Sequence, residues 1–222
     1  MNIPFTIEQF LSVFEKYNLT IWPMQIVLYL LALVAIFLTL KPRKAAGRII
    51  SLILAIFWLW MGIVYHLLFF TAINPAAYIF AMLYIVQAIL FLVAGIIKTN
   101  LSFKFQANLY GLTGALFLIY ALLVYPLLGY AFGHAYPAMP TFGAPCPTTI
   151  FTFGILLLTV KRVPKYLLVI PFLWSLLGFS AAVNLMIKED FGLLAAGILG
   201  TALIIMKDRK GTGKEPVISR NL

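Results

Sequence analysis

The stretch IISLILAIFWLWMGIVYHLLFF, residues 49–70, contains no residue that is fully charged at neutral pH, and its one histidine is His66. A helix needs about 20 apolar residues to cross the hydrocarbon core of a bilayer. Backbone polar groups in lipid must be satisfied within the segment itself, and a helix satisfies them. The stretch therefore predicts a transmembrane helix, and we read the rest of the chain outward from it.

Apolar stretches of similar character recur on both sides of this one. The 222-residue chain is 64% hydrophobic and 10% charged, far from the composition of a soluble domain. Hydropathy predicts an all-α, polytopic bundle that forms a single domain over residues 1–206. The seven expected spans are 22–40, 49–70, 76–97, 109–130, 142–160, 166–187 and 191–206.

Basic residues alternate with these spans. Of the 16 lysines and arginines, only Lys16 and Lys188 fall in connections on one side of the expected bundle. The other side collects Lys41, Arg43, Lys44, Arg48, Lys98, Lys104, Lys161, Arg162, Lys165, Lys207, Arg209, Lys210, Lys214 and Arg220. Cytoplasmic loops carry such an excess, so we expect the N-terminus outside and the C-terminus in the cytoplasm. The net charge of +10 is thus explained by topology, and no nucleic-acid partner is expected.

The two ends of the chain differ from the spans. Residues 5–17 begin with a capping-box pattern, Thr6 and Gln9, and turn apolar side chains to one helical face. This pattern predicts an amphipathic interfacial helix, either a lid over the bundle or a surface anchor. Residues 207–222, KDRKGTGKEPVISRNL, predict a basic, disordered cytoplasmic tail.

The least membrane-like stretch is GHAYPAMPTFGAPCPTTIF, residues 133–151, which holds the only cysteine of the chain, Cys146. Proline is favoured in the first turn of a helix, and the residue before a proline prefers an extended backbone. We therefore expect an extended segment over 137–145 that turns at Gly143 into a helix starting near Cys146 or Pro147. This geometry places a thiol at a helix N-terminus, which favours the thiolate.

The remaining polar residues gather on the expected outer side. Polar and ionisable residues in membrane segments are functional-site candidates. The candidate ligand-binding residues are Cys146, His134, His66, Asn74, Thr148 and Asn184. A thiolate with two imidazoles suits a soft metal ion, so Cys146, His134 and His66 are also the candidate metal ligands. The alternatives are packing roles: a histidine bonded to a backbone carbonyl, and a cysteine that acts as a small hydrophobe.

Several classes of chemistry are excluded by what the sequence lacks. One cysteine cannot form an internal disulfide or a paired-cysteine zinc site. The chain has no HExxH motif and no Walker-type glycine loop, and the expected spans contain no pair of carboxylates. These absences argue against an enzyme, and the sequence identifies no catalytic residue and no cofactor.

The motifs HAYP and PTFGAPCPTTIFTFG, with WLWMGIVYHLLFF, INPAAY and PFTIEQF, cover most of the chain. In these motifs the sequence resembles a family of small bacterial polytopic membrane proteins classified as a domain of unknown function. The resemblance implies a bacterial inner-membrane location and carries over no activity or site residue.

Three hypotheses follow. The first is a small inner-membrane transporter, channel or sensor for a small solute or soft metal ion, with an outward-facing site around residues 133–151. The second is an intramembrane enzyme with a cysteine nucleophile and a histidine base, which requires thiol and imidazole within hydrogen-bonding distance. The third is an accessory subunit that binds another membrane protein. The lipid bilayer is the one partner common to all three, and a homo-oligomer is compatible with each.

Overall fold

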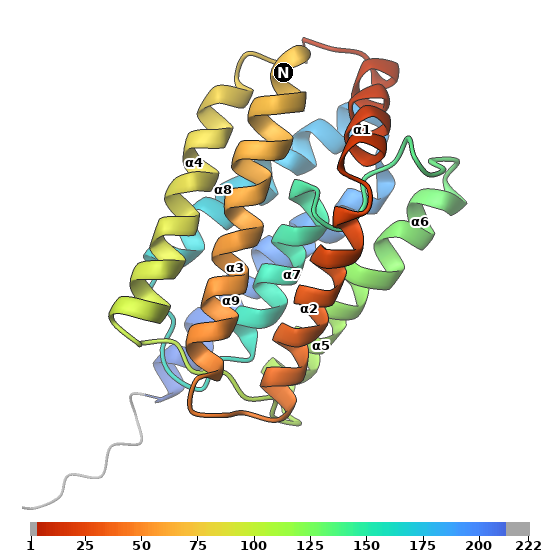
Figure 1. Ribbon diagram of the computed structural model, residues 1–222. Coiled ribbons are helices and arrows are strands. Elements are labelled where there is room, and N and C mark those ends of the chain that lie inside the picture. The colour runs from red at the N-terminus through yellow and green to blue at the C-terminus, as the bar shows by residue number, and fades with distance from the viewer. Residues whose placement is uncertain (1–3, 212–222) are drawn as a thin grey trace, which may run out of the picture.

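The computed structural model describes residues 4–211, which are helical apart from short connections and so confirm the all-α prediction (Figure 1). The α-helices are α1 (Ile7–Ile21), α2 (Met24–Leu40), α3 (Ala46–Trp60), α4 (Ala77–Leu92), α5 (Leu109–Ile119), α6 (Tyr125–Ala131), α7 (Pro145–Leu157), α8 (Tyr166–Leu185) and α9 (Phe191–Gly211). Turns of π-helix over Met61–Phe69, Val93–Ile97 and Tyr120–Val124, and of 3-10 helix over Phe70–Ala72 and Lys188–Asp190, extend several of these rods.

Five of these helical rods are long and apolar enough to cross a membrane: Ala46–Ala72, Ala77–Ile97, Leu109–Ala131, Tyr166–Leu185 and Lys188–Lys210. Helices α1 and α2 together make a sixth candidate, although they meet at an angle of 86°. The remaining predicted span corresponds to α7, whose 13 residues are too few to cross a bilayer as a helix. Length and composition thus support five or six spans within residues 4–211.

Two prolines inside helices leave carbonyl groups free for contacts between helices. A proline has no N–H, so the carbonyl four residues before it loses its helical partner. Pro126 leaves the Leu122 carbonyl free, and the Tyr29 hydroxyl donates to it at 3.3 Å. Pro171 leaves the Leu167 carbonyl free, and the Gln87 side-chain amide donates to it at 3.0 Å. Each proline thereby fixes one helix against a neighbour.

Helix α7 forms the centre of the bundle. Every residue of α7 except Cys146 is buried. Neighbouring helices approach closely through small residues; a Cβ at Gly114 on α5, for example, would lie 2.8 Å from the Gly154 carbonyl oxygen. An entirely buried apolar helix has no lipid-facing side, so its position depends on what holds its two ends.

The C-terminal end of α7 is held by Lys207, and we call it the capped end. The Lys207 ammonium donates to the carbonyls of Leu156, Leu157 and Thr159 at 3.5, 3.3 and 2.9 Å, and to the Thr159 hydroxyl at 2.5 Å. A cation there satisfies the last carbonyls and the negative end of the helix dipole. Helix α9 runs on to Gly211, whereas the predicted span ends at Met206 and the predicted disordered tail begins at Lys207. Residues 212–222 of that tail lie outside the described residues.

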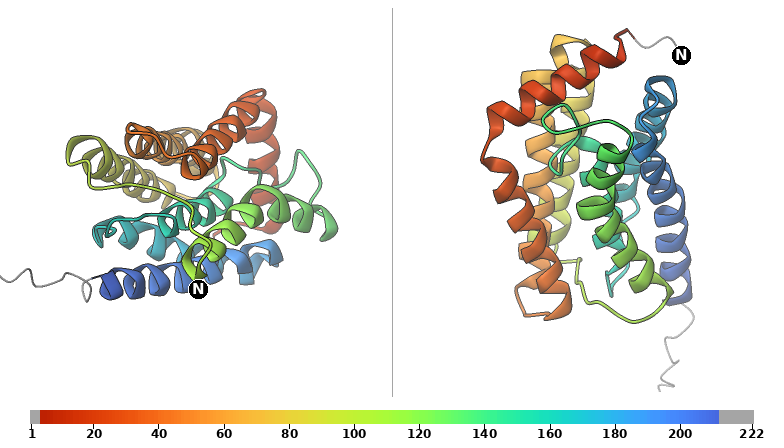
Figure 2. Two further views of the ribbon diagram at one scale, coloured as in Figure 1. Left: turned by 90° about the horizontal axis from the view of Figure 1, so that it is seen from below. Right: turned by 90° about the vertical axis from the view of Figure 1, so that its right-hand side faces the viewer.

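The opposite end of α7 lies beneath α1, and we call it the cavity end. Helix α1 lies across this end of the bundle, steeply inclined to α2 (Figure 2). The connections 41–45 and 98–108 lie at the capped end (Figure 1). The two ends of the bundle therefore differ in structure as well as in charge.

Candidate functional site

A cavity of about 360 Å³ lies at the cavity end of the bundle. Its walls come from the N-terminal segment and α1, from the α3–α4 connection and the start of α4, from the first turn of α7, from α8 and from the turn that precedes α9. The lining residues are Pro4, Phe5, Phe10, Phe14, Tyr65, Phe70, Asn74, Ala76, Phe80, Pro145, Cys146, Trp174, Leu177, Gly178, Ser180, Ala181, Ala182, Ile187 and Asp190. A mostly apolar cavity with a few polar groups is the usual form of a small-molecule site.

Helix α1 covers this cavity with its apolar face. Its N-terminus has the predicted capping box, in which the Thr6 hydroxyl accepts from the Gln9 N–H and the Gln9 side chain accepts from the Thr6 N–H. Phe10 and Phe14 then point into the cavity, and the rings of Phe10, Phe14 and Phe70 pack edge to face. The capped start fixes the register that presents these rings to the cavity.

The proline-rich segment builds the floor of the cavity. Gly143 has a φ of +100°, a conformation that favours glycine, and α7 begins two residues later at Pro145. The Thr148 hydroxyl accepts from the Gly143 N–H at 3.1 Å and holds this turn. The predicted turn at Gly143 is confirmed, and α7 begins one residue before the predicted start. Cys146, in the first turn of α7, faces the cavity.

A cluster of hydrogen bonds ties α1 to the proline-rich segment. Asn18 is fully buried, and its amide donates to the carbonyls of Pro137 and Met139 at 2.7 and 2.8 Å. The Thr141 hydroxyl donates to the Asn18 carbonyl oxygen at 2.8 Å. The Tyr17 hydroxyl donates to the Gly143 carbonyl at 3.0 Å. We call these contacts of Tyr17 and Asn18 the α1 clamp.

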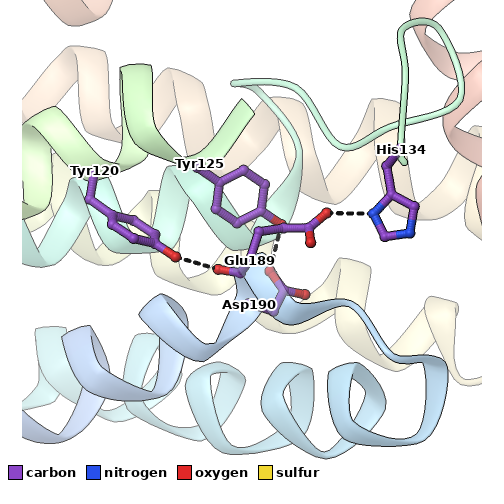
Figure 3. Close-up of polar contacts among 5 residues, drawn as sticks. All are labelled: Tyr120, Tyr125, His134, Glu189 and Asp190. Carbon is purple, nitrogen blue, oxygen red and sulfur yellow. Dashed lines mark hydrogen bonds and ion pairs between the residues drawn. The ribbon is translucent and has the colours of Figure 1, made fainter. Parts of the chain in front are cut away.

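Two acidic side chains are buried where α9 begins (Figure 3). Asp190 accepts a hydrogen bond of 2.5 Å from the Tyr125 hydroxyl, and Glu189 lies 2.9 Å from Nδ1 of His134. The Tyr120 hydroxyl donates to the Glu189 main-chain carbonyl at 2.7 Å. No pair of carboxylates is expected in the spans, since both residues fall in the connection between the spans 166–187 and 191–206. This expectation is wrong in effect, because the chain folds both carboxylates into the bundle.

The cavity brings together only part of the predicted ligand set. Cys146 and Asn74 line it, and the Cys146 thiol lies beside the Asp190 carboxylate and Trp174. Thr148 is used in the turn at Gly143, and Asn184 is exposed with its amide bonded to the Ser180 carbonyl. These two side chains serve local structure.

The two histidines lie in different surroundings outside the cavity lining. His134 is bonded to Glu189. His66 is fully buried among the rings of Tyr65, Phe70, Phe80, Tyr84 and Trp174, and neither of its nitrogens has a hydrogen-bond partner. The expected alternative for His66, a bond to a backbone carbonyl, is therefore not what the structure contains.

This arrangement bears on the metal and nucleophile hypotheses. Within residues 4–211, no three histidine, cysteine, aspartate or glutamate side chains lie close enough together to hold a metal ion. No hydrogen bond joins Cys146 to His66 or His134 in this part of the chain either. Cys146, His134 and His66 thus do not form the soft-metal set that the sequence suggested.

Several residues of the site escape the sequence analysis. Asp190 and Trp174 line the cavity, and Tyr17 and Asn18 form the α1 clamp. The signal for Asp190 was present: a pair of acidic residues directly before an apolar stretch, where an uncompensated charge is costly. For Asn18, the sequence gives no sign that residues 137–141 are its partners.

Comparison with known proteins identifies the family and nothing more. The model of a family of unknown function, DUF6064, matches residues 7–214, and the chain belongs to that family. Neither the curated proteins nor the solved structures contain a match.

Proposed function

We propose that this protein is a small membrane transporter, channel or sensor that binds a small solute in the cavity beneath α1. The observation that carries the proposal is the cavity itself, which is lined by aromatic rings and a few polar groups. Its volume suits a small organic molecule. Helix α1 acts as its lid.

The orientation is part of the proposal. The chain crosses the bacterial inner membrane seven times, with α2 as a short crossing and with α7, too short to cross alone, completing its crossing together with its flanking residues over 142–160. The positive-inside rule assigns the capped end to the cytoplasm, because the basic connections are grouped there. The N-terminus, the interfacial helix α1 and the cavity then face outward, so the solute enters from outside.

The residues that line the cavity favour an organic solute over a soft metal ion. Cys146 is the only one of the three suggested metal ligands that lines the cavity, and the rest of the wall is largely apolar, with seven aromatic side chains. In this reading Cys146 and Asn74 are solute contacts. The enzyme hypothesis has no thiol–imidazole contact to support it, and the accessory-subunit hypothesis does not account for a lined cavity.

Sided labelling tests the proposal, because Cys146 is the only thiol in the chain. A membrane-impermeant maleimide added to intact spheroplasts is expected to label Cys146 slowly, because the thiol is partly buried beneath α1. In a Cys146→Ser background, a cysteine at exposed Ala107, in a capped-end connection, should resist the reagent until the membrane is broken. A cysteine at exposed Glu15, on α1, should react at once.

Two outcomes would contradict the proposal. Rapid labelling of Ala107→Cys in intact spheroplasts would reverse the orientation. Complete protection of Cys146, even after α1 is loosened by substitution of Asn18, would mean that no accessible cavity reaches the thiol.

A further inference from the structure

Among the residues that the structure describes, the cavity is lined by one carboxylate and by no basic side chain. Its lining includes Asp190 but no lysine, arginine or histidine. One oxygen of Asp190 accepts from the Tyr125 hydroxyl. The Tyr125 hydroxyl and the Cys146 thiol beside Asp190 are both neutral partners, so neither compensates the charge of an ionised Asp190.

One candidate counterion, His134, is already in use. Nδ1 of His134 lies 2.9 Å from a Glu189 carboxylate oxygen, so His134 is the partner of Glu189 and not of Asp190. The second Glu189 oxygen is buried without a hydrogen-bond partner. A buried charge is costly unless it is paired, so an ionised Asp190 calls for a cation from outside the described chain.

The rest of the wall offers a second attraction for a cation. Seven aromatic side chains line the cavity: Phe5, Phe10, Phe14, Tyr65, Phe70, Phe80 and Trp174. The faces of aromatic rings carry partial negative charge and attract ammonium groups, most strongly on tryptophan. An aromatic enclosure is also the known way in which proteins bind quaternary ammonium ions.

From these two features together we infer that the solute is an organic cation, an amine or quaternary ammonium that carries apolar groups. Its charge pairs with Asp190, and its apolar groups contact the rings of α1, the α3–α4 connection and α8. An inorganic cation would leave the apolar wall unused, and an organic anion would be repelled by Asp190. This inference rests on the proposed function and names the chemical class of its solute.

A pair of probes with matched shapes tests the inference. Phenyltrimethylammonium and tert-butylbenzene differ in one atom, a positively charged nitrogen in place of a neutral carbon. Binding of each to the purified full-length protein in detergent micelles is measured by calorimetry. We expect the wild-type protein to bind the cation at least about tenfold more tightly than the isostere, since one paired charge readily supplies that factor.

Four variants separate the contribution of the cavity from that of its charge. Asp190→Asn keeps an acceptor for Tyr125 and should lose about tenfold or more in affinity for the cation, with the isostere unaffected. Glu8→Gln removes an exposed acid on α1 outside the lining and should change neither affinity. Ala181→Phe fills the cavity and should weaken binding of both probes. Trp174→Leu, which keeps every acid, should weaken binding of the cation more than that of the isostere.

The outcomes distinguish two kinds of failure. Equal affinity for the two probes in the wild-type protein, or no effect of Asp190→Asn on the cation, would overturn the cation class and leave the cavity as a site for neutral solutes. Undiminished binding of both probes to Ala181→Phe would show that they bind elsewhere, and would count against the proposed function itself. Thermal melting of each variant establishes that it is folded before its affinity is compared.

Discussion

The two ends of α7 are held in opposite ways. At the capped end, one ammonium group from α9 occupies the space below the last turn and bonds to four oxygens. At the cavity end, the chain is held by neutral hydrogen bonds, one from the Gly143 N–H to the Thr148 hydroxyl and one from Tyr17 of α1 to the Gly143 carbonyl. The Lys207 ammonium occupies the space beneath the last turn of α7 at the capped end, whereas a mostly apolar cavity of about 360 Å³ adjoins the first turn of α7 at the cavity end.

This difference indicates which end can move. A charged group with several buried partners cannot leave without exposing all of them, and the cost of breaking such a set is large. The α1 clamp consists of neutral hydrogen bonds, each worth far less. Opening at the cavity end is therefore the cheaper motion, which agrees with a lid there and a fixed support at the other end.

The largest effect should come from removing the charge at the capped end. In Lys207→Met, the oxygens of Leu156, Leu157 and Thr159 lose their common donor, and we expect a loss of about 4 kcal/mol in the free energy of unfolding. Thermal melting in detergent micelles measures this loss. Lys210→Met, on an exposed lysine in the same turn, is the matched control and should change little. Equal stabilities of the two variants would mean that the cap does not hold α7.

The α1 clamp should give the next largest effect. Asn18→Ala removes three hydrogen bonds, and we expect a loss of about 3 kcal/mol together with faster maleimide labelling of Cys146. Thr20→Ala, exposed on the same helix, serves as the control. Lys207→Met should leave the labelling rate nearly unchanged despite its larger effect on stability. Faster labelling in Lys207→Met than in Asn18→Ala would reverse our assignment of the mobile end.

A smaller effect is expected within the floor of the cavity. Thr148→Val keeps the shape of the side chain but leaves the buried Gly143 N–H unpaired, which should cost about 1.5 kcal/mol. Thr149→Val is the comparison, because its hydroxyl donates to the Pro145 carbonyl and plays no part in the turn at Gly143. The labelling rate of Cys146 should rise in Thr148→Val and stay constant in Thr149→Val.

The smallest effect concerns the start of the lid. Thr6→Ala removes the capping box from an exposed helix end and should cost about 0.5 kcal/mol. Hydrogen–deuterium exchange at the first turn of α1 measures the fraying directly. Faster exchange confined to residues 7–10 is expected. Exchange that spreads through the whole of α1 would indicate that the cap, rather than the α1 clamp, keeps the lid in place.

The sequence predicts the local features of this fold well. The apolar stretches locate the helices, the Thr6–Gln9 pattern predicts the start of α1, and Gly143 with the prolines predicts the turn into α7. Each of these rests on residues a few positions apart, where the chain's own geometry decides the outcome.

The features that the sequence does not predict depend on partners far along the chain. Helix α7 is apolar on every side, so no periodicity shows which of its faces meets Lys207 or the cavity. In the sequence Lys207 looks like the first residue of a polar tail, but α9 extends far enough to place it at the C-terminal end of α7. Asp190 resembles an outer-loop charge until Tyr125 and the rings of the cavity surround it.

The α1 clamp also sets an order for biosynthesis. Tyr17 bonds to a residue 126 positions later in the chain, and the contacts of Asn18 span 119 to 123 positions. When α1 leaves the ribosome, its binding partner has not been synthesised, and the aromatic face of α1 has no cavity to cover. Contacts of such long sequence separation form late. The nascent α1 must therefore wait for its partners until the chain has been synthesised past Gly143, so the α1 clamp cannot form during the synthesis of the first half of the bundle.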